Sequence, residues 1–314
     1  MVALQQMLVL FIIMMIGCIA YKTGLITDET GKKLSGIVVN ISNPALILSG
    51  VIGNDTVTGQ ELVITMGIAI GMYVFLIAAA FIVPVILRVP AESAATYRVM
   101  TIFSNIGFMG FPIISSMYGS DALLYGALFL MPYNILIYTY GIHELTKNNR
   151  NEKQSGGTKG SKKIKWSQIF NIGVIFCIAA IIIFAFNIKL PEWINTTVSM
   201  LSATTAPLSM MVIGASLATM NFKKMFGNVR MWAFSFIKMI ILPIIGTLLV
   251  RMATDNVSII GVTMVMLSVP VGSMTAMLAS EYDGDYALSS EMVAMTTLLS
   301  VVTFPLVTML LGRI

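Results

Sequence analysis

The sequence predicts an all-α integral membrane protein with ten transmembrane helices, arranged as two inverted repeats of five helices. Three observations predict this fold: an apolar composition, apolar runs that recur along the chain, and an internal repeat. The 314 residues are 57% hydrophobic and only 11% charged, and the mean hydropathy is +0.89. These values lie outside the range of soluble globular domains, so the composition indicates a chain that folds in a bilayer.

The apolar runs have the length that a membrane span requires. A helix needs about 20 predominantly apolar residues to cross the hydrocarbon core. Runs of this kind recur along nearly the whole chain, and we expect the first to be a retained helix rather than a cleaved leader. The predicted spans cover residues 4–21, 34–52, 62–87, 96–118, 122–142, 169–187, 197–220, 229–250, 257–280 and 286–311.

The distribution of positive charge predicts which loops face the cytoplasm, because Lys and Arg near span ends are retained there. Fifteen basic residues lie in or beside the loops that follow spans 1, 3, 5, 7 and 9. Only Lys189, Arg251 and Arg313 lie on the opposite side, and Lys238 lies within a span. This asymmetry predicts that both termini are outside and that the central loop is cytoplasmic.

The central loop divides the chain into two halves. We predict a first repeat over residues 1–145, a cytoplasmic linker over 146–168 and a second repeat over 169–314. The linker is rich in Gly, Ser and Lys and has no apolar periodicity, which is typical of a flexible segment. Beside a membrane, its positive charge is accounted for by cytoplasmic retention and attraction to anionic lipid, so we expect no nucleic-acid partner.

Similar residues recur in the two halves at equivalent spans. Three pairs are separated by 163 or 164 residues: Tyr118–Asp121 and Tyr282–Asp285, Ser104 and Ser268, and Pro44 and Pro207. Agreement among three offsets indicates a shared fold. Because each half has an odd number of spans, two halves with the same fold must be inserted in opposite senses.

Two spans are interrupted by glycine and proline near their middles, within residues 101–112 of span 4 and 267–275 of span 9. Proline removes a backbone donor, and glycine tolerates the unwound conformations that follow. An unpaired peptide group is costly in hydrocarbon, so such breaks persist only where they face protein or a water-filled cavity. Two breaks at matching places of a repeat therefore predict broken helices 4 and 9 around one shared polar site.

The broken helices also predict the charge of the ligand. We expect half-helices to begin near Gly110–Ile113, with Pro112 in the first turn, and near Gly272–Met274. Two converging amino ends favour an anion, most simply a carboxylate. The predicted binding residues are Ser104, Asn105, Gly107, Gly110, Pro112, Ser268, Pro270, Gly272, Ser273, Thr275 and, from span 2, Asn43.

The same segments resemble the auxin efflux carrier family over essentially the full chain. Asn40–Ser49 is similar to that family's Leu-Pro-Ala-Leu segment, Asn105–Pro112 to its Gly-Asn-x-Gly-x-x-Gly-x-Pro motif, and Ala279–Asp285 to the segment after its crossover helix. The resemblance implies a panel-plus-crossover arrangement in which helices 4 and 9 cross at the site. It also implies secondary active transport of organic anions such as malate, malonate or indole-acetate-like carboxylates, which we expect to proceed by alternating access.

One departure from the family motif leaves the coupling ion open. Ser104 replaces the usual glycine, and the Ser104–Asn105 pair is similar to the related bile acid:sodium symporters. A sodium-coupled organic-anion symporter, with Na⁺ near Ser104, Asn105 and Asn134, is therefore the alternative function. We expect no cofactor, with H⁺ or Na⁺ as the coupling ion if there is one.

Three further residues are candidates for coupling or charge balance. Lys238 lies in the middle of span 8, where a charge is costly and usually faces the interior. Glu291, near the start of span 10, pairs with Lys238 in one interpretation and lies at the membrane surface in another. Asn134 is a polar candidate for an ion or substrate pocket. Asn43, beside a proline, has a second interpretation in which it only satisfies loosened backbone groups.

No catalytic constellation is present in the sequence, so we do not expect an enzyme. An intramembrane enzyme built on Asp283 and Asp285 is a further alternative, but both lie in a short loop and lack a second aspartate in a neighbouring helix. Cys18, Cys177 and His143 have no metal-binding spacing. We predict a multi-pass protein of a cell membrane, most simply a bacterial inner membrane, with an organic anion and the bilayer as partners and homodimerisation left open.

Overall fold

The computed structural model describes residues 2–52, 57–146, 172–219, 227–282 and 284–311. Every regular element within these ranges is helical, and their one isolated β-bridge joins Ser104 to Val271. The predicted linker at 146–168 lies, from residue 147 onward, outside the described residues.

The helices follow one another along the chain in two sets. The first set is α1 (Val2–Lys22), α2 (Asp28–Ile37), η1 (Val38–Ser42), α3 (Asn43–Ser49), α4 (Gly59–Ile86), α5 (Ala91–Ile102), η2 (Ile106–Gly110), α6 (Phe111–Tyr118), α7 (Ala122–Leu136) and η3 (Ile137–Gly141). The second set is α10 (Ile172–Ala185), α11 (Glu192–Ala203), α12 (Thr205–Ala218), α14 (Val229–Phe236), η4 (Ile237–Ile241), α15 (Leu242–Arg251), α16 (Val257–Ser268), α17 (Ser273–Glu281) and α18 (Tyr286–Leu311).

The π-helical turns η1, η2 and η4 each end two residues before a proline, namely Pro44, Pro112 and Pro243. In each case the residue before the proline donates its amide to the carbonyl five residues earlier. Proline has no amide hydrogen, and its ring clashes with the carbonyl one turn earlier. A wider turn accommodates the ring and re-pairs the neighbouring groups, so the helix continues through the proline.

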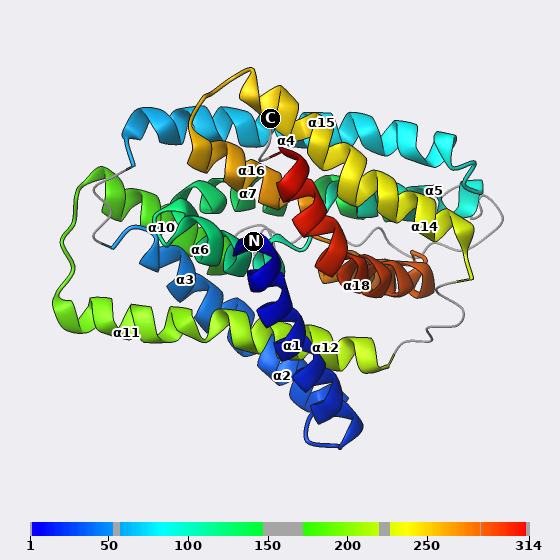
Figure 1. Ribbon diagram of the computed structural model, residues 1–314, viewed down its shortest axis with the longest axis horizontal. Coiled ribbons are helices and arrows are strands. Elements are labelled where there is room, and N and C mark those ends of the chain that lie inside the picture. The colour runs from blue at the N-terminus through cyan, green and yellow to red at the C-terminus, as the bar shows by residue number, and fades with distance from the viewer. Residues whose placement is uncertain (1, 53–56, 147–171, 220–226, 283, 312–314) are drawn as a thin grey trace, which may run out of the picture.

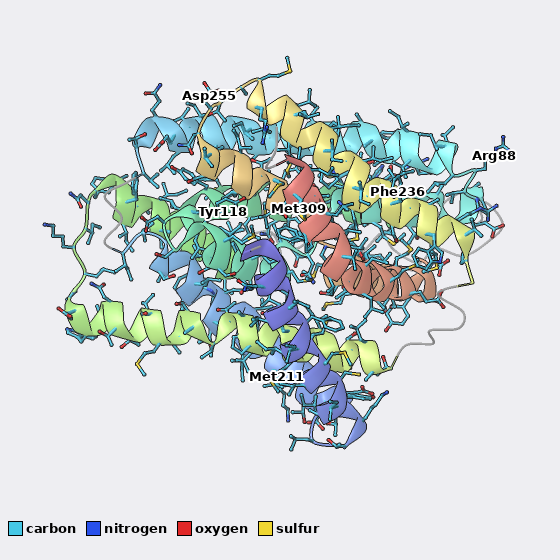
Figure 2. All side chains as sticks on the ribbon, viewed as in Figure 1. Arg88, Tyr118, Met211, Phe236, Asp255 and Met309 are labelled. Atoms are coloured by element: carbon cyan, nitrogen blue, oxygen red, sulfur yellow. The ribbon has the colours of Figure 1, made fainter. Side chains whose placement is uncertain are left out.

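Helix length and composition identify a membrane protein. Within the described ranges, five helical stretches are long and apolar enough to span a membrane: Gly59–Ile86, Ala122–Thr146, Glu192–Ala218, Val229–Arg251 and Tyr286–Leu311. Shorter apolar helices cover Leu8–Lys22, Ile106–Tyr118, Ile172–Ala185 and Val257–Ser268. Large apolar side chains lie on the outer surface, for example Phe236 on α14 and Met309 on α18, which are 55% and 59% exposed (Figure 2). The protein is therefore an all-helical, multi-pass membrane protein.

We name two groups of helices, which also contact each other where α10 packs on α7 and α1 packs on α18. In the frame group, α1 packs along α12, and α3 packs against α10 and α11. Gly17 and Gly214 allow the close approach of α1 and α12, because a Cβ atom at either position would overlap the backbone of the other helix. In the crossover group, α4 packs on α5 and α7, α15 packs on α16, and α17 packs on α18. Figure 1 shows α11 and α12 along the lower edge of the molecule and α4 and α15 along the upper edge.

Polar contacts tie the crossover group together near both ends of its helices. Glu61 completes a capping box at the start of α4 and also accepts a 2.6 Å hydrogen bond from Asn256 Nδ2. The Oδ1 of the same asparagine caps α16 by accepting the Ser258 and Ile259 amides. At the other end, Arg98 of α5 donates to Glu144 over 2.7 Å. These contacts link separate helices through polar groups that the bilayer interior cannot solvate.

Candidate functional site

The two interrupted helices meet at their breaks. Helix α5 ends at Ile102 and α16 ends at Ser268, and the extended residues that follow pair in antiparallel fashion. The Asn105 amide donates to Pro270 O over 2.7 Å, and the Gly272 amide donates to Phe103 O over 3.0 Å. Each unwound segment thus supplies the backbone partners that the other has lost. This exchange is what allows two helices to open inside an apolar protein.

Glycine is required at this crossing. A Cβ atom on Gly272 would lie 2.9 Å from the Ser104 carbonyl oxygen and 3.3 Å from the Phe103 carbonyl oxygen. Any larger residue would therefore push the two extended segments apart.

The first resumed helix begins earlier than the sequence predicts. The Asn105 side chain caps it by accepting the Phe108 amide over 3.3 Å, and η2 starts at Ile106. The Gly110 amide donates to Asn105 O, and the Phe111 amide donates to Ile106 O. The prediction that free amides begin at Gly110–Ile113 is therefore wrong, because the π turn carries the helix through Pro112 and moves its amino end to Asn105.

The second resumed helix begins where it is predicted, with α17 starting at Ser273 directly after Gly272. Thr275 supports this start, since its hydroxyl donates to Gly272 O over 2.7 Å. Pro270 lies in the extended segment, and its carbonyl accepts the Asn105 amide. The crossing therefore places the amino ends of η2 and α17 on segments that are hydrogen-bonded to each other.

Buried oxygens without partners surround the crossing. Ser104 Oγ and Ser268 Oγ are buried and have no hydrogen-bond partner among the described residues. The same holds for Asn43 Oδ1, and the Asn43 amide nitrogen lies 3.4 Å from where a Cβ of Gly107 would be. Buried polar groups are nearly always paired, so unpaired ones in a cluster mark a place for a ligand or water.

Helix α12 contributes two residues that the sequence reasoning missed. Thr205 and Ser209 are buried with unpaired hydroxyls, and α12 packs against η1 and η2. Their spacing of four residues on an otherwise apolar helix is the signal that predicts a shared polar face. Ser42 of η1 also contacts α12 through Thr204, with 2.8 Å between the two hydroxyls. Helix α12, which packs against η1 and η2, thus adds buried polar groups to this part of the bundle.

Lys238 lies on η4 and is 1% exposed. Its ammonium donates to Thr101 O over 2.7 Å. In an unbroken helix this carbonyl would accept the Asn105 amide, which instead bonds Pro270 O. Lys238 therefore donates to a carbonyl that has lost its helical partner at the break. This carbonyl lies at the carboxyl end of α5, where a positive charge is favourable.

Glu291 does not share this position. It lines a separate cavity of about 260 Å³ together with Arg230, Asp285 and Tyr97, beside the starts of α5, α14 and α18. Lys238 is not among the residues that line this cavity. The charged residues that line it with Glu291 are Arg230, in the first turn of α14, and Asp285, just before α18.

Asn134 lies on α7 and is buried. Its side-chain nitrogen donates to Leu130 O in the preceding turn over 2.8 Å. The neighbouring Tyr133 ring packs edge-to-face on Phe103, with 5.5 Å between ring centroids. Among the described residues, no group of three or more His, Cys, Asp and Glu side chains is arranged to hold a metal ion.

Interrupted helices that cross inside a multi-pass helical bundle define a class of protein, the membrane transporters. A family model described as membrane transport protein matches residues 2–308. The chain belongs to this family, the auxin efflux carrier family, and is a transporter rather than an enzyme.

Two archaeal proteins are similar to the chain over almost its full length. An uncharacterized transporter of Methanothermobacter thermautotrophicus is 25% identical over 315 residues, covering 96% of both chains. An uncharacterized transporter of Methanocaldococcus jannaschii is 23% identical over 320 residues, covering 98% of both chains.

Proposed function

We propose that the protein is a secondary active transporter of small organic anions, with the substrate carboxylate bound where the two interrupted helices cross. Malate, malonate and indole-acetate-like acids are the proposed substrate class. The observation that carries the proposal is the hydrogen-bonded crossing of residues 103–105 with 269–272, surrounded by buried oxygens that have no partner.

Charge supports an anion as the substrate. Neither interrupted segment contains an acidic residue within 101–112 or 267–275. The Asn105 oxygen is used to cap η2, which leaves its Nδ2 donor to bind a carboxylate oxygen. The hydroxyls of Ser104, Ser268 and Ser273 supply further donors, and Lys238 places a positive charge one turn before Asn105. Donors and positive charge in a dry site favour a carboxylate over a neutral solute.

The proposed transport cycle is alternating access. We propose ten spans in two inverted repeats, residues 1–145 and 169–314, with both termini outside and the connecting linker in the cytoplasm. In this proposal the crossover group moves against the frame group and exposes the site to one side at a time. The packing within each group supports it, and the surfaces that would slide are those where α1 meets α18, α10 meets α7 and α12 meets η2.

Substitution of Asn105 tests the proposal. Asn105→Ala removes both the cap and the donor, so carboxylate binding should be lost while membrane insertion is retained. Asn105→Asp is sharper, because it keeps an oxygen for the Phe108 amide but replaces the donor with a negative charge. We expect at least a tenfold loss of carboxylate affinity in both variants, measured by ligand-induced thermal shift of purified protein.

Asn40→Ala is the matched control, because Asn40 is exposed and its side chain bonds only its own helix at Gly36 O. Wild-type affinity in Asn105→Asp would contradict the proposed site.

A sodium-coupled symporter is the second candidate. It is favoured by one observation, the unpaired buried hydroxyl of Ser104 beside Asn105, which offers an oxygen ligand to a cation. Uptake into proteoliposomes with and without a Na⁺ gradient separates the two candidates. Uptake that depends on Na⁺ at constant pH supports the symporter, and uptake that follows only the pH gradient supports proton coupling.

A further inference from the structure

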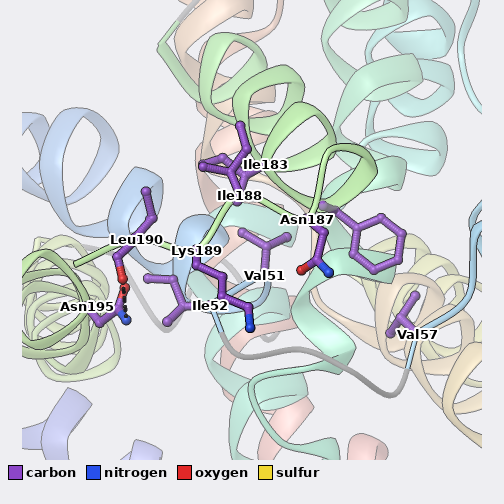
Figure 3. Close-up of a pocket in the computed structure, with 10 residues that line it drawn as sticks. Val51, Ile52, Val57, Ile183, Asn187, Ile188, Lys189, Leu190 and Asn195 are labelled. Carbon is purple, nitrogen blue, oxygen red and sulfur yellow. Dashed lines mark hydrogen bonds between the residues drawn. The ribbon is translucent and has the colours of Figure 1, made fainter. Parts of the chain in front are cut away.

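A second polar cavity lies away from the crossing. It has a volume of about 530 Å³ and is lined by Val51, Ile52, Val57, Ile183, Phe184, Asn187, Ile188, Lys189, Leu190 and Asn195 (Figure 3). These residues come from the end of α3, the segment before α4, the end of α10 and the start of α11. None belongs to the candidate substrate site, so the cavity needs its own explanation.

The carboxyl end of α10 builds one wall. The Ile188 amide donates to Ile183 O over 2.9 Å, and the Asn187 amide donates to Phe184 O over 3.1 Å. Asn187 has φ of +46°. This is a Schellman cap with asparagine in the left-handed position, and it turns the chain sharply out of the helix. The turn brings Lys189 over the cavity and packs Ile188 beside Ile183 (Figure 3).

Among the described residues that line the cavity, the polar side chains are the amides of Asn187 and Asn195 and the amine of Lys189. Asn195 Nδ2 donates to Leu190 O over 3.3 Å, while Asn195 Oδ1 is buried and has no hydrogen-bond partner in the part of the chain that the structure describes. Lys189 reaches into the space between Ile52 and Asn187 in Figure 3. None of the described lining residues is acidic. The described lining residues therefore offer a ligand one cation, Lys189, and one buried hydrogen-bond acceptor without a donor, Asn195 Oδ1.

The surrounding surface is typical of a membrane–water boundary. Phe186 at the end of α10 is 76% exposed, and Trp193 in the first turn of α11 is 70% exposed. Exposed aromatic rings at helix ends are enriched at the level of the lipid headgroups. The other wall is apolar, formed by Val51, Ile52 and Phe184. A ligand that fits must combine a negative group, a hydrogen-bond donor and an apolar portion.

We propose that this cavity binds the headgroup of a membrane phospholipid. The phosphodiester lies against Lys189, a hydroxyl or ammonium of the headgroup donates to Asn195 Oδ1, and the glycerol and upper acyl chains cover the apolar wall. A fatty acid lacks the donor, and inorganic phosphate lacks the apolar portion. The bound lipid would join α3, α10 and α11, three helices of the frame group.

Lipid binding to the delipidated full-length protein in detergent tests the proposal, with native mass spectrometry and thermal shift as readouts. Four probes separate the required features: dioleoyl phosphatidylethanolamine, dioleoyl phosphatidylcholine, dioleoylglycerol and inorganic phosphate. Phosphatidylethanolamine should bind about tenfold more tightly than phosphatidylcholine, which has no donor, and than dioleoylglycerol, which has no phosphate. Inorganic phosphate should neither bind nor compete at equal concentration.

Two variants assign the binding to this cavity. Lys189→Gln should weaken phosphatidylethanolamine binding about tenfold, whereas Lys32→Gln, on an exposed lysine of α2, should leave it unchanged. Asn195→Leu should remove the preference over phosphatidylcholine. Wild-type binding by Lys189→Gln, or equal binding of all three lipids, would overturn the proposal. Competition by inorganic phosphate at equal concentration would overturn the lipid assignment in favour of a free-anion site.

Discussion

Removal of the buried ammonium of Lys238 should change the stability of the protein and its transport activity independently. In the Lys238→Met variant, a side chain of similar length replaces the lysine without its charge. The Lys238–Thr101 hydrogen bond is lost, and a bond to a charged group contributes about 1.5–3 kcal/mol. Against this, the effective cost of burying an ammonium is several kcal/mol, and the variant no longer carries it. We expect a free energy of unfolding that is unchanged or higher by about 1–3 kcal/mol.

Transport should fall in the same variant. At an effective dielectric constant of about 20, two unit charges attract by about 4 kcal/mol at 4 Å and by about half of that at twice the distance. The smaller value, about 2 kcal/mol, corresponds to roughly 30-fold in affinity. Lys238→Arg keeps the charge and should retain more of the affinity than Lys238→Met.

The assay combines thermal unfolding of purified protein with uptake of radiolabelled carboxylate into proteoliposomes. Two results would refute the reasoning. A loss of more than about 3 kcal/mol of unfolding free energy in Lys238→Met would mean that the ammonium is mainly structural. Carboxylate affinity within twofold of the wild type would mean that the charge does not act on the substrate.

Two further substitutions test the packing of the crossover group. Glu144→Ala leaves Arg98 without its carboxylate and should cost about 3 kcal/mol of unfolding stability. The control is the exposed ion pair of Lys33 with Glu29, whose charged atoms are 2.8 Å apart. Lys33→Ala should change the free energy of unfolding by less than about 0.5 kcal/mol. Equal losses of stability in Glu144→Ala and Lys33→Ala would contradict the argument. Gly50→Val should disfavour the conformation in which the end of α3 packs closely on α7, since a Cβ on Gly50 would lie 2.9 Å from the Leu123 Cβ of α7. We expect slower uptake of substrate. We also expect greater labelling of an engineered cysteine near Gly50, because this contact between α3 and α7 would be opened. Unchanged uptake and labelling would show that the contact does not limit the transport cycle.

The positions of the helix breaks were predictable, but their detailed form was not. Gly107, Gly110 and Pro112 indicate an interruption in span 4, and the structure places the extended segment at 103–105. The predicted position of the amino end of the resumed helix was wrong by several residues, because the sequence does not reveal that a π turn accommodates Pro112 within the helix. The π turns at η1 and η4, before Pro44 and Pro243, result from the same chemistry.

Partners across the fold were also beyond the sequence. Lys238 and Thr101 are 137 residues apart, and a backbone carbonyl as the partner of a buried lysine leaves no trace in side-chain composition. The cavity at Lys189 and Asn195 was missed for a related reason. Its polar groups are unremarkable in the sequence, and only the cap at the end of α10 brings them to the same space.

The sequence by itself determined that the chain folds as a helical membrane protein of a transporter family and that two of its helices are interrupted. Those properties depend on composition and on local backbone chemistry, which each segment carries with it. Only the tertiary structure decided that residues 103–105 and 269–272 bond each other, that Lys238 fills the carbonyl left open at Thr101, and that Ser104 and Ser268 stay unpaired. Inside a bilayer no water satisfies a broken helix, so its partners depend on which distant segments pack beside it.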